Sequence, residues 1–165
     1  MSASLWAAVS MVASCIARRY RTEDDASPTP DFITQRRAEN LADDQRGHVL
    51  ILAGTELQAM QWCADGFHGR QTQRRSKLFR SAPVHDRDEL RLARRNGADL
   101  VLISPLFATG SHPGERPMGK SRFNALAAQS GKAAVIALGG MTARKAALLN
   151  RNHVHGWAAI DAFRK

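Results

Sequence analysis

Residues 97–112 read GADLVLISPLFATGSH, and this stretch decides the fold class. Its first half, Asp99 to Ser104, is dominated by aliphatic residues, which is typical of a parallel strand buried on both faces. A loop rich in Gly, Pro, Ser and His follows, and apolar residues then recur at helical spacing after Ser121. The stretch therefore predicts one strand–loop–helix unit of an α/β sheet.

The same alternation recurs along the chain and predicts seven strands, at residues 14–20, 48–53, 66–68, 78–84, 99–104, 133–138 and 156–160. Strands that alternate with helices indicate a mostly parallel sheet. The units are short and no GxGxxG motif is present, so we predict a (β/α)8 TIM-type barrel, incomplete with seven parallel strands, rather than a dinucleotide-binding fold. One domain spans 1–165, with an N-terminal helix in 1–13 and the barrel in 14–162.

Composition supports a globular domain with anionic partners. The chain has 165 residues, of which 44% are hydrophobic, and 24 Lys and Arg against 15 Asp and Glu give a net charge of +9. Two cysteines exclude a disulfide framework and suit a cytoplasmic protein. No run of apolar residues is long enough for a membrane span, and the basic residues follow the apolar stretch from Leu5 to Ala17, the reverse of a secretory signal.

Several residues are placed to start or end helices. Asp86 is an expected N-cap, and Glu89 completes a capping-box pattern with it. Gly97 is expected to end that helix, and Ser121 and Thr142 are expected to cap the two later ones.

Candidate site residues follow the predicted strands, where barrels build their sites. Gly139 and Gly140 lie between a strand and a helix, so their amides and the helix N-terminus predict a phosphate site; a tight turn is the alternative. Hydroxyls and an imidazole at Thr109, Ser111 and His112 suit an oxyanion, unless the loop is simply solvated. His68 and His85 either line this pocket or are structural.

Together these stretches resemble the thiamine phosphate synthase / thiazole tautomerase family. The family shows ADGVH, then GADYVxxGPxFxTxTK, then AxGGI, and finally GVAxxSA. Here the counterparts lie at residues 64–68, 97–112, 137–141 and 156–162, and His85 with Glu89 resembles the family's SxHxxxE.

The resemblance implies that the protein joins a pyrimidine pyrophosphate to a thiazole phosphate with loss of pyrophosphate. It places His112, Thr109 and Ser111 against pyrophosphate and thiazole as catalytic residues. It assigns substrate and phosphate binding to the residues at the other strand ends: Arg18, Tyr20, His68, His85, Gly139, Gly140 and Ile160. It also implies Mg²⁺ and a phosphorylated small-molecule substrate.

The expected Mg²⁺ ligands are missing. The family's first metal carboxylate falls at Ala53-Gly54, and its second falls just beyond His68, where residues 69–72 contain no carboxylate. An alternative function is therefore a non-catalytic or tautomerase-type relative that binds a phosphorylated thiazole without magnesium, with His112 or His68 as acid and base.

A basic cluster spans residues 70–80 and comprises Arg70, Arg74, Arg75, Lys77 and Arg80. With Phe79 as its one aromatic residue and no nucleic-acid motif, we expect no nucleic-acid partner. Phosphate binding in place of a metal and a solvated basic face both stay open. The strand at 14–20 corresponds to the family's second strand, so the first strand is missing and the sheet has an exposed edge. Three explanations stay open: the true start lies upstream, a partner such as a second copy of the chain covers the edge, or the protein is degenerate.

Overall fold

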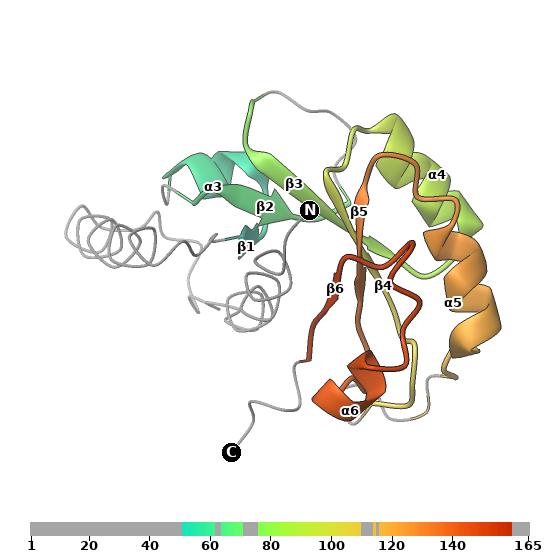
Figure 1. Ribbon diagram of the computed structural model, residues 1–165. Helices are drawn as coiled ribbons and strands as arrows, with labels where there is room; N and C mark the ends of the chain where they lie inside the picture. Colours follow the sequence, from blue (N-terminus) through green and yellow to red (C-terminus); the bar gives the residue numbers. More distant parts are fainter. Residues whose placement is uncertain (1–50, 62–63, 71–75, 110–113, 115, 160–165) are drawn as a thin grey trace, which may run out of the picture.

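Six parallel strands form one sheet in the order β1-β2-β3-β4-β5-β6, so each strand pairs with its neighbours in sequence (Figure 1). The computed structural model describes residues 51–61, 64–70, 76–109, 114 and 116–159. The strands are β1 Ile51–Ala53, β2 Gly66–His68, β3 Phe79–Val84, β4 Leu100–Ile103, β5 Ala134–Ala137 and β6 Gly156–Trp157. The helices are α3 Glu56–Gln61, α4 Arg87–Arg95, α5 Gly119–Ala127 and α6 Ala143–Ala146.

All six of these strands coincide with predicted ones, which confirms a parallel α/β architecture. The predicted helix in 1–13 and the strand at 14–20 lie outside the described residues. The described part therefore shows six strands and leaves the predicted seventh untested. No helix in the described ranges is both long and apolar enough to cross a bilayer.

The two faces of the sheet carry separate cores. One face packs against α4 and α5, and its buried side chains include Val101, Ile103, Val135 and Phe123. Figure 1 shows these two helices along the same side of the sheet. The opposite face carries a smaller apolar cluster made by Ile51, Leu100, Leu102, Ile136 and Ala158. Both faces of β4 are buried, as expected of a central parallel strand.

The strand register places the last residues of neighbouring strands side by side at the C-terminal edge of the sheet. His68 lies beside Ser81, and Val84 beside Ile103, which in turn lies beside Ala137. Because the strands are parallel, the segments that follow them all leave from this one edge. The described candidate residues that follow these strands, His68, His85, Gly139 and Gly140, therefore lie at this edge.

Side-chain caps fix the starts of three helices. Thr55 and Gln58 form a reciprocal capping box before α3: the Gln58 amide donates to the Thr55 hydroxyl, and the Thr55 amide donates to Gln58 Oε1. Asp86 accepts hydrogen bonds from two backbone amides of α4, and Thr142 accepts one from Lys145 in α6, which confirms both predicted N-caps.

Two predicted caps are wrong. Helix α5 starts at Gly119, two residues before Ser121, and has no side-chain cap. A tertiary hydrogen bond from the Met118 amide to the Pro105 carbonyl, at 2.9 Å, lies at its start instead. In a capping box, the Glu89 side chain would accept from the backbone amide of the N-cap Asp86. Glu89 instead accepts from the amide of the preceding residue, His85, at 2.7 Å.

Loss of the Asp86 cap should destabilise the protein. Asp86→Ala leaves two amides of the first turn of α4 without their side-chain acceptor, and we expect it to lower the unfolding free energy by about 1 kcal/mol. Urea unfolding measures the change. Asp88→Ala is the control, because Asp88 is 87% exposed and pairs only with Arg91 among the described side chains. Equal losses in the two variants would contradict the capping role.

Candidate functional site

The turn after β5 packs directly on the loop after β4. The Phe107 amide donates to the Gly139 carbonyl at 3.1 Å, and the Leu106 amide donates to the Leu138 carbonyl at 2.9 Å. Both Gly139 and Gly140 have positive φ, +92° and +59°. A Cβ atom on Gly139 would lie 2.7 Å from the Cα of Pro105, and one on Gly140 would lie 2.1 Å from the Ala108 carbonyl oxygen. The glycine pair is thus required for this close approach as well as for the turn.

The amides of this turn are available to a ligand. Within the described part of the chain, no hydrogen bond is donated by the backbone amides of Gly139, Gly140 and Met141. Partly buried amides without an acceptor are costly, and an oxyanion is a group that satisfies several at once. The tight turn is therefore present at these two residues, and the phosphate site stays a prediction for the same turn.

Lys145 supplies positive charge beside the glycine turn. Its Nζ donates to the Gly140 carbonyl at 2.6 Å and lies 4.7 Å from the centroid of the Phe107 ring. Sequence reasoning predicted that the following helix would contribute its N-terminal dipole. Helix α6 has only four residues, so the charge at this turn comes from the Lys145 ammonium instead.

His68 and Ser81 form a polar pair at the C-terminal ends of β2 and β3. His68 Nδ1 lies 2.6 Å from Ser81 Oγ, and the Ser81 side chain is fully buried. Burial lowers the pKa of His68 from 6.5 to about 4, because the charged imidazolium loses its hydration. His68 is therefore a neutral imidazole at pH 7, able to accept a proton or share a hydrogen bond but unable to serve as a cation.

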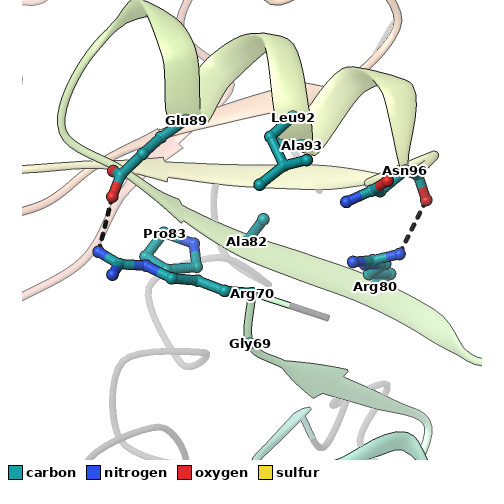
Figure 2. Close-up of a pocket in the computed structure, with 9 residues that line it drawn as sticks. All are labelled: Gly69, Arg70, Arg80, Ala82, Pro83, Glu89, Leu92, Ala93 and Asn96. Carbon is teal, nitrogen blue, oxygen red and sulfur yellow. Dashed lines mark hydrogen bonds and ion pairs between the residues drawn. The ribbon is translucent and has the colours of Figure 1, made fainter. Parts of the chain in front are cut away.

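His85 belongs to a different group, formed with Glu89 and Arg70, and Figure 2 shows the Arg70–Glu89 pair of this group. Glu89 Oε1 lies 2.7 Å from Arg70 Nη2, and Glu89 Oε2 lies 2.7 Å from His85 Nδ1. This carboxylate joins the segment after β2 to the start of α4. Beneath it is a small, half-open pocket with a volume of about 30 Å³. The pocket is lined by Gly69, Arg70, Arg80, Ala82, Pro83, Glu89, Leu92, Ala93 and Asn96.

The residues at the ends of β1 and β2 do not fit Mg²⁺. Magnesium needs hard oxygen ligands, above all carboxylates. The segments after these strands begin with Gly54 and with Gly69-Arg70, and the nearby carboxylate of Glu89 is already held by a guanidinium and an imidazole. In the described ranges, no group of three or more His, Cys, Asp or Glu side chains could hold a metal ion.

The structure brings together some of the predicted site residues. Thr109 follows the loop that packs on Gly139 and Gly140, whereas the contacts described for His68 and His85 involve Ser81, Glu89 and Arg70. The remaining predicted residues lie outside the described ranges: Arg18, Tyr20, Ser111, His112 and Ile160. Sequence reasoning missed Lys145 and Ser81. The position of Lys145, three residues after the N-cap Thr142, could have drawn attention to it, whereas Ser81 depends on strand register.

The buried neutral His68 predicts a pH dependence of stability. The unfolded chain takes up a proton near pH 6.5, while the folded chain resists protonation down to about pH 4. The unfolding free energy should therefore fall as the pH drops through this window, by up to about 1.4 kcal/mol per pH unit, and level off below it.

Urea unfolding between pH 7 and 4 tests this prediction. His68→Gln should flatten the profile, whereas the exposed His153→Gln should retain the slope of the wild type. If His68→Gln and the wild type show the same dependence of unfolding free energy on pH, His68 is not the source of that dependence.

Comparisons with known proteins agree with this architecture. The family model described as thiamine monophosphate synthase matches residues 14–163. A protein of Aquifex aeolicus (strain VF5) named "Putative thiamine-phosphate synthase 2" is 33% identical over 80 residues, or 48% of this chain and 42% of that protein. The match thus spans less than half the length of this curated relative.

The fold also matches a solved structure, the thiamine phosphate pyrophosphorylase from Pyrococcus furiosus. The TM-score is 0.64 at 20% identity, and the match covers 82% of this chain and 68% of that one. This likeness shows a shared fold. Since the family model spans nearly the whole sequence, the chain belongs to the thiamine monophosphate synthase family.

Proposed function

We propose that this chain is a thiamine phosphate synthase-like protein of thiamine biosynthesis that binds the phosphate of a phosphorylated thiazole at the turn after β5. One observation carries the proposal: the Gly139–Gly140 turn packs on the Pro105–Ala108 loop and presents amides that no described protein group accepts from. Lys145 adds a positive charge at the same turn. Family membership supports the choice of ligand.

In the synthase reaction, a pyrimidine pyrophosphate and a thiazole phosphate are joined. The C–O bond to pyrophosphate breaks, the pyrimidine-methyl carbon becomes electrophilic, and the thiazole nitrogen supplies the electron pair of the new C–N bond. We assign the amides of Gly139 and Gly140, with Ile160, to the thiazole phosphate. Thr109, Ser111 and His112 are assigned to the pyrophosphate and thiazole on the adjoining loop, and Arg18 and Tyr20 to the substrate.

A second candidate function is favoured by the ends of β1 and β2. These ends lack the hard ligands of a magnesium site, so a relative that binds a phosphorylated thiazole without magnesium, non-catalytic or acting as a tautomerase, fits the same phosphate turn. A tautomerase needs a group that moves a proton. We assign this role to the neutral imidazole of His68, hydrogen-bonded to Ser81, although its pKa of about 4 makes it a weak base at pH 7.

We further infer that residues 14–20 add a seventh parallel strand next to β1 and that the sheet curves into a barrel. The fold shared with the Pyrococcus furiosus enzyme supports this inference. A barrel of seven strands has an open edge, which a second copy of the chain could cover. The low cysteine count supports a cytoplasmic location.

Substitution of the glycine pair should weaken ligand binding. Gly139→Ala and Gly140→Ala place a Cβ atom against Pro105 or the Ala108 carbonyl and so displace the turn. We expect each to weaken binding of thiazole phosphate by about tenfold or more in isothermal titration calorimetry, through loss of charge-assisted hydrogen bonds.

Gly131→Ala is the matched control. Gly131 also has a positive φ, +69°, but precedes β5 and so lies at the opposite edge of the sheet. The alanine therefore adds similar backbone strain without touching the turn, and affinity should stay within about twofold of the wild type. An equal loss in all three variants would show that the effect is one of stability.

A coupled assay separates the two candidate functions. Purified protein is incubated with both thiamine precursors, once with Mg²⁺ and once with excess chelator, and thiamine phosphate is measured. Turnover above the background of a Gly140→Ala control supports the synthase. Thiazole phosphate binding without turnover supports the non-catalytic or tautomerase-type relative, and absence of both binding and turnover contradicts both candidates.

A further inference from the structure

The sequence that follows β2 is basic at the strand end where a metal-dependent site needs oxygen ligands. Residues 69–78, which connect β2 to β3, contain four basic side chains and no acidic one. Arg70 is the first of these basic residues and stands at the C-terminal edge, two residues after the end of β2. A guanidinium at this edge repels a divalent cation and attracts the oxyanion that such a cation would otherwise neutralise.

Arg70 is held in a defined orientation. Glu89 Oε1 lies 2.7 Å from its Nη2, and Glu89 is itself fixed by the amide and the ring of His85, each at 2.7 Å from Oε2. The Arg70 side chain is nevertheless 63% exposed, compared with 25% for Glu89. One edge of the guanidinium is therefore anchored by Glu89, and the exposed Arg70 side chain lines the pocket under α4 (Figure 2).

Charged groups of both signs surround Arg70, since Asp86 and Asp88 lie at the start of α4 beside Glu89. Glu89 contributes one negative charge, whereas Arg122 reaches the same corner and donates to the His85 carbonyl at 3.4 Å. Arg80 lines the far end of the pocket, fully buried, and donates to the Asn96 carbonyl at 2.8 Å. Arg80 is too deeply buried to contact a ligand, whereas the Arg70 side chain is exposed at the pocket.

We propose that Arg70, oriented by Glu89, binds the pyrophosphate group of the second ligand directly, so that this group binds without a divalent cation. The inference rests on the proposed function, because it assigns the pyrophosphate-bearing partner to the same strand edge as the thiazole phosphate. Arg70 acts by contact, whereas Glu89 is a positioning residue. A guanidinium matches this role because its planar N–H groups bind phosphate oxygens in pairs.

The test is the binding of inorganic pyrophosphate to the full chain, measured by calorimetry in excess chelator and again with Mg²⁺. We expect binding in chelator, and Arg70→Gln should weaken it by about tenfold or more. The matched control is Arg91→Gln, which removes an equal charge from α4; Arg91 pairs with Asp88 at 2.8 Å and is 71% exposed. Its affinity should change by less than about twofold. Wild-type binding that requires Mg²⁺, or equal losses in the two variants, would overturn the proposal.

Glu89→Gln separates positioning from simple attraction. The variant removes a negative charge beside Arg70, so attraction alone predicts tighter binding of pyrophosphate. Loss of the anchor predicts weaker binding, which we expect, and tighter binding would overturn the role of Glu89. Because Glu89 also accepts from the His85 amide, circular dichroism and the Tm verify that the variant is folded, and Arg70→Lys, which keeps the charge without the planar fork, provides an independent variant that should also bind more weakly.

Thiazole phosphate binding in the same proteins distinguishes failure of this inference from failure of the proposed function. If thiazole phosphate binds and depends on Gly140 but pyrophosphate needs Mg²⁺, the inference fails and the proposed function stands. If thiazole phosphate does not bind, the proposed function fails.

Discussion

The contact between two backbone segments, the Gly139–Gly140 turn and the Pro105–Ala108 loop, organises the C-terminal edge of this sheet. Neither glycine has room for a Cβ atom, and paired hydrogen bonds join the two segments. Other features build on that contact. The Pro105 carbonyl accepts from the Met118 amide at the start of α5, and the Lys145 ammonium lies between the Gly140 carbonyl and the Phe107 ring. Within the described residues, the amides of Gly139, Gly140 and Met141 donate no hydrogen bond in this arrangement.

The strand edge has two chemically different halves. Around β4 and β5, backbone amides and one lysine suit the phosphate of a small molecule. Around β2 and β3, a neutral imidazole, a hydroxyl and an arginine held by a glutamate are found, with no cluster suited to a hard cation among the described residues. The proposed binding of pyrophosphate through Arg70 follows from this second half of the edge.

Strand positions and several helix starts could be predicted from the sequence because they depend on local patterns. The aliphatic run Leu100–Ile103 predicts a buried strand from its composition alone. Asp86 and Thr142 cap helices that directly follow them in the sequence, so their hydrogen bonds are local. Ser121 failed because the start of α5 is fixed by a tertiary hydrogen bond to Pro105, which no local pattern reveals.

The site was predictable to a similar extent. The turn at Gly139 and Gly140 could be predicted because a glycine pair between a strand and a helix favours a tight turn, whereas the phosphate site at this turn stays a prediction. The pairing of His68 with Ser81 depends on strand register, and the second role of Glu89 depends on the path of the chain after β2, so neither could be read from spacing. The family resemblance supplied ligand identities that no pattern of burial or charge contains.

Amide chemical shifts test the central claim most directly. In a ¹⁵N-labelled sample titrated with thiazole phosphate, we predict that the largest downfield shifts occur at the amides of Gly139, Gly140 and Met141, as expected when amides gain a charged acceptor. Saturable shifts confined to other parts of the sheet, with these three amides unchanged, would contradict the account.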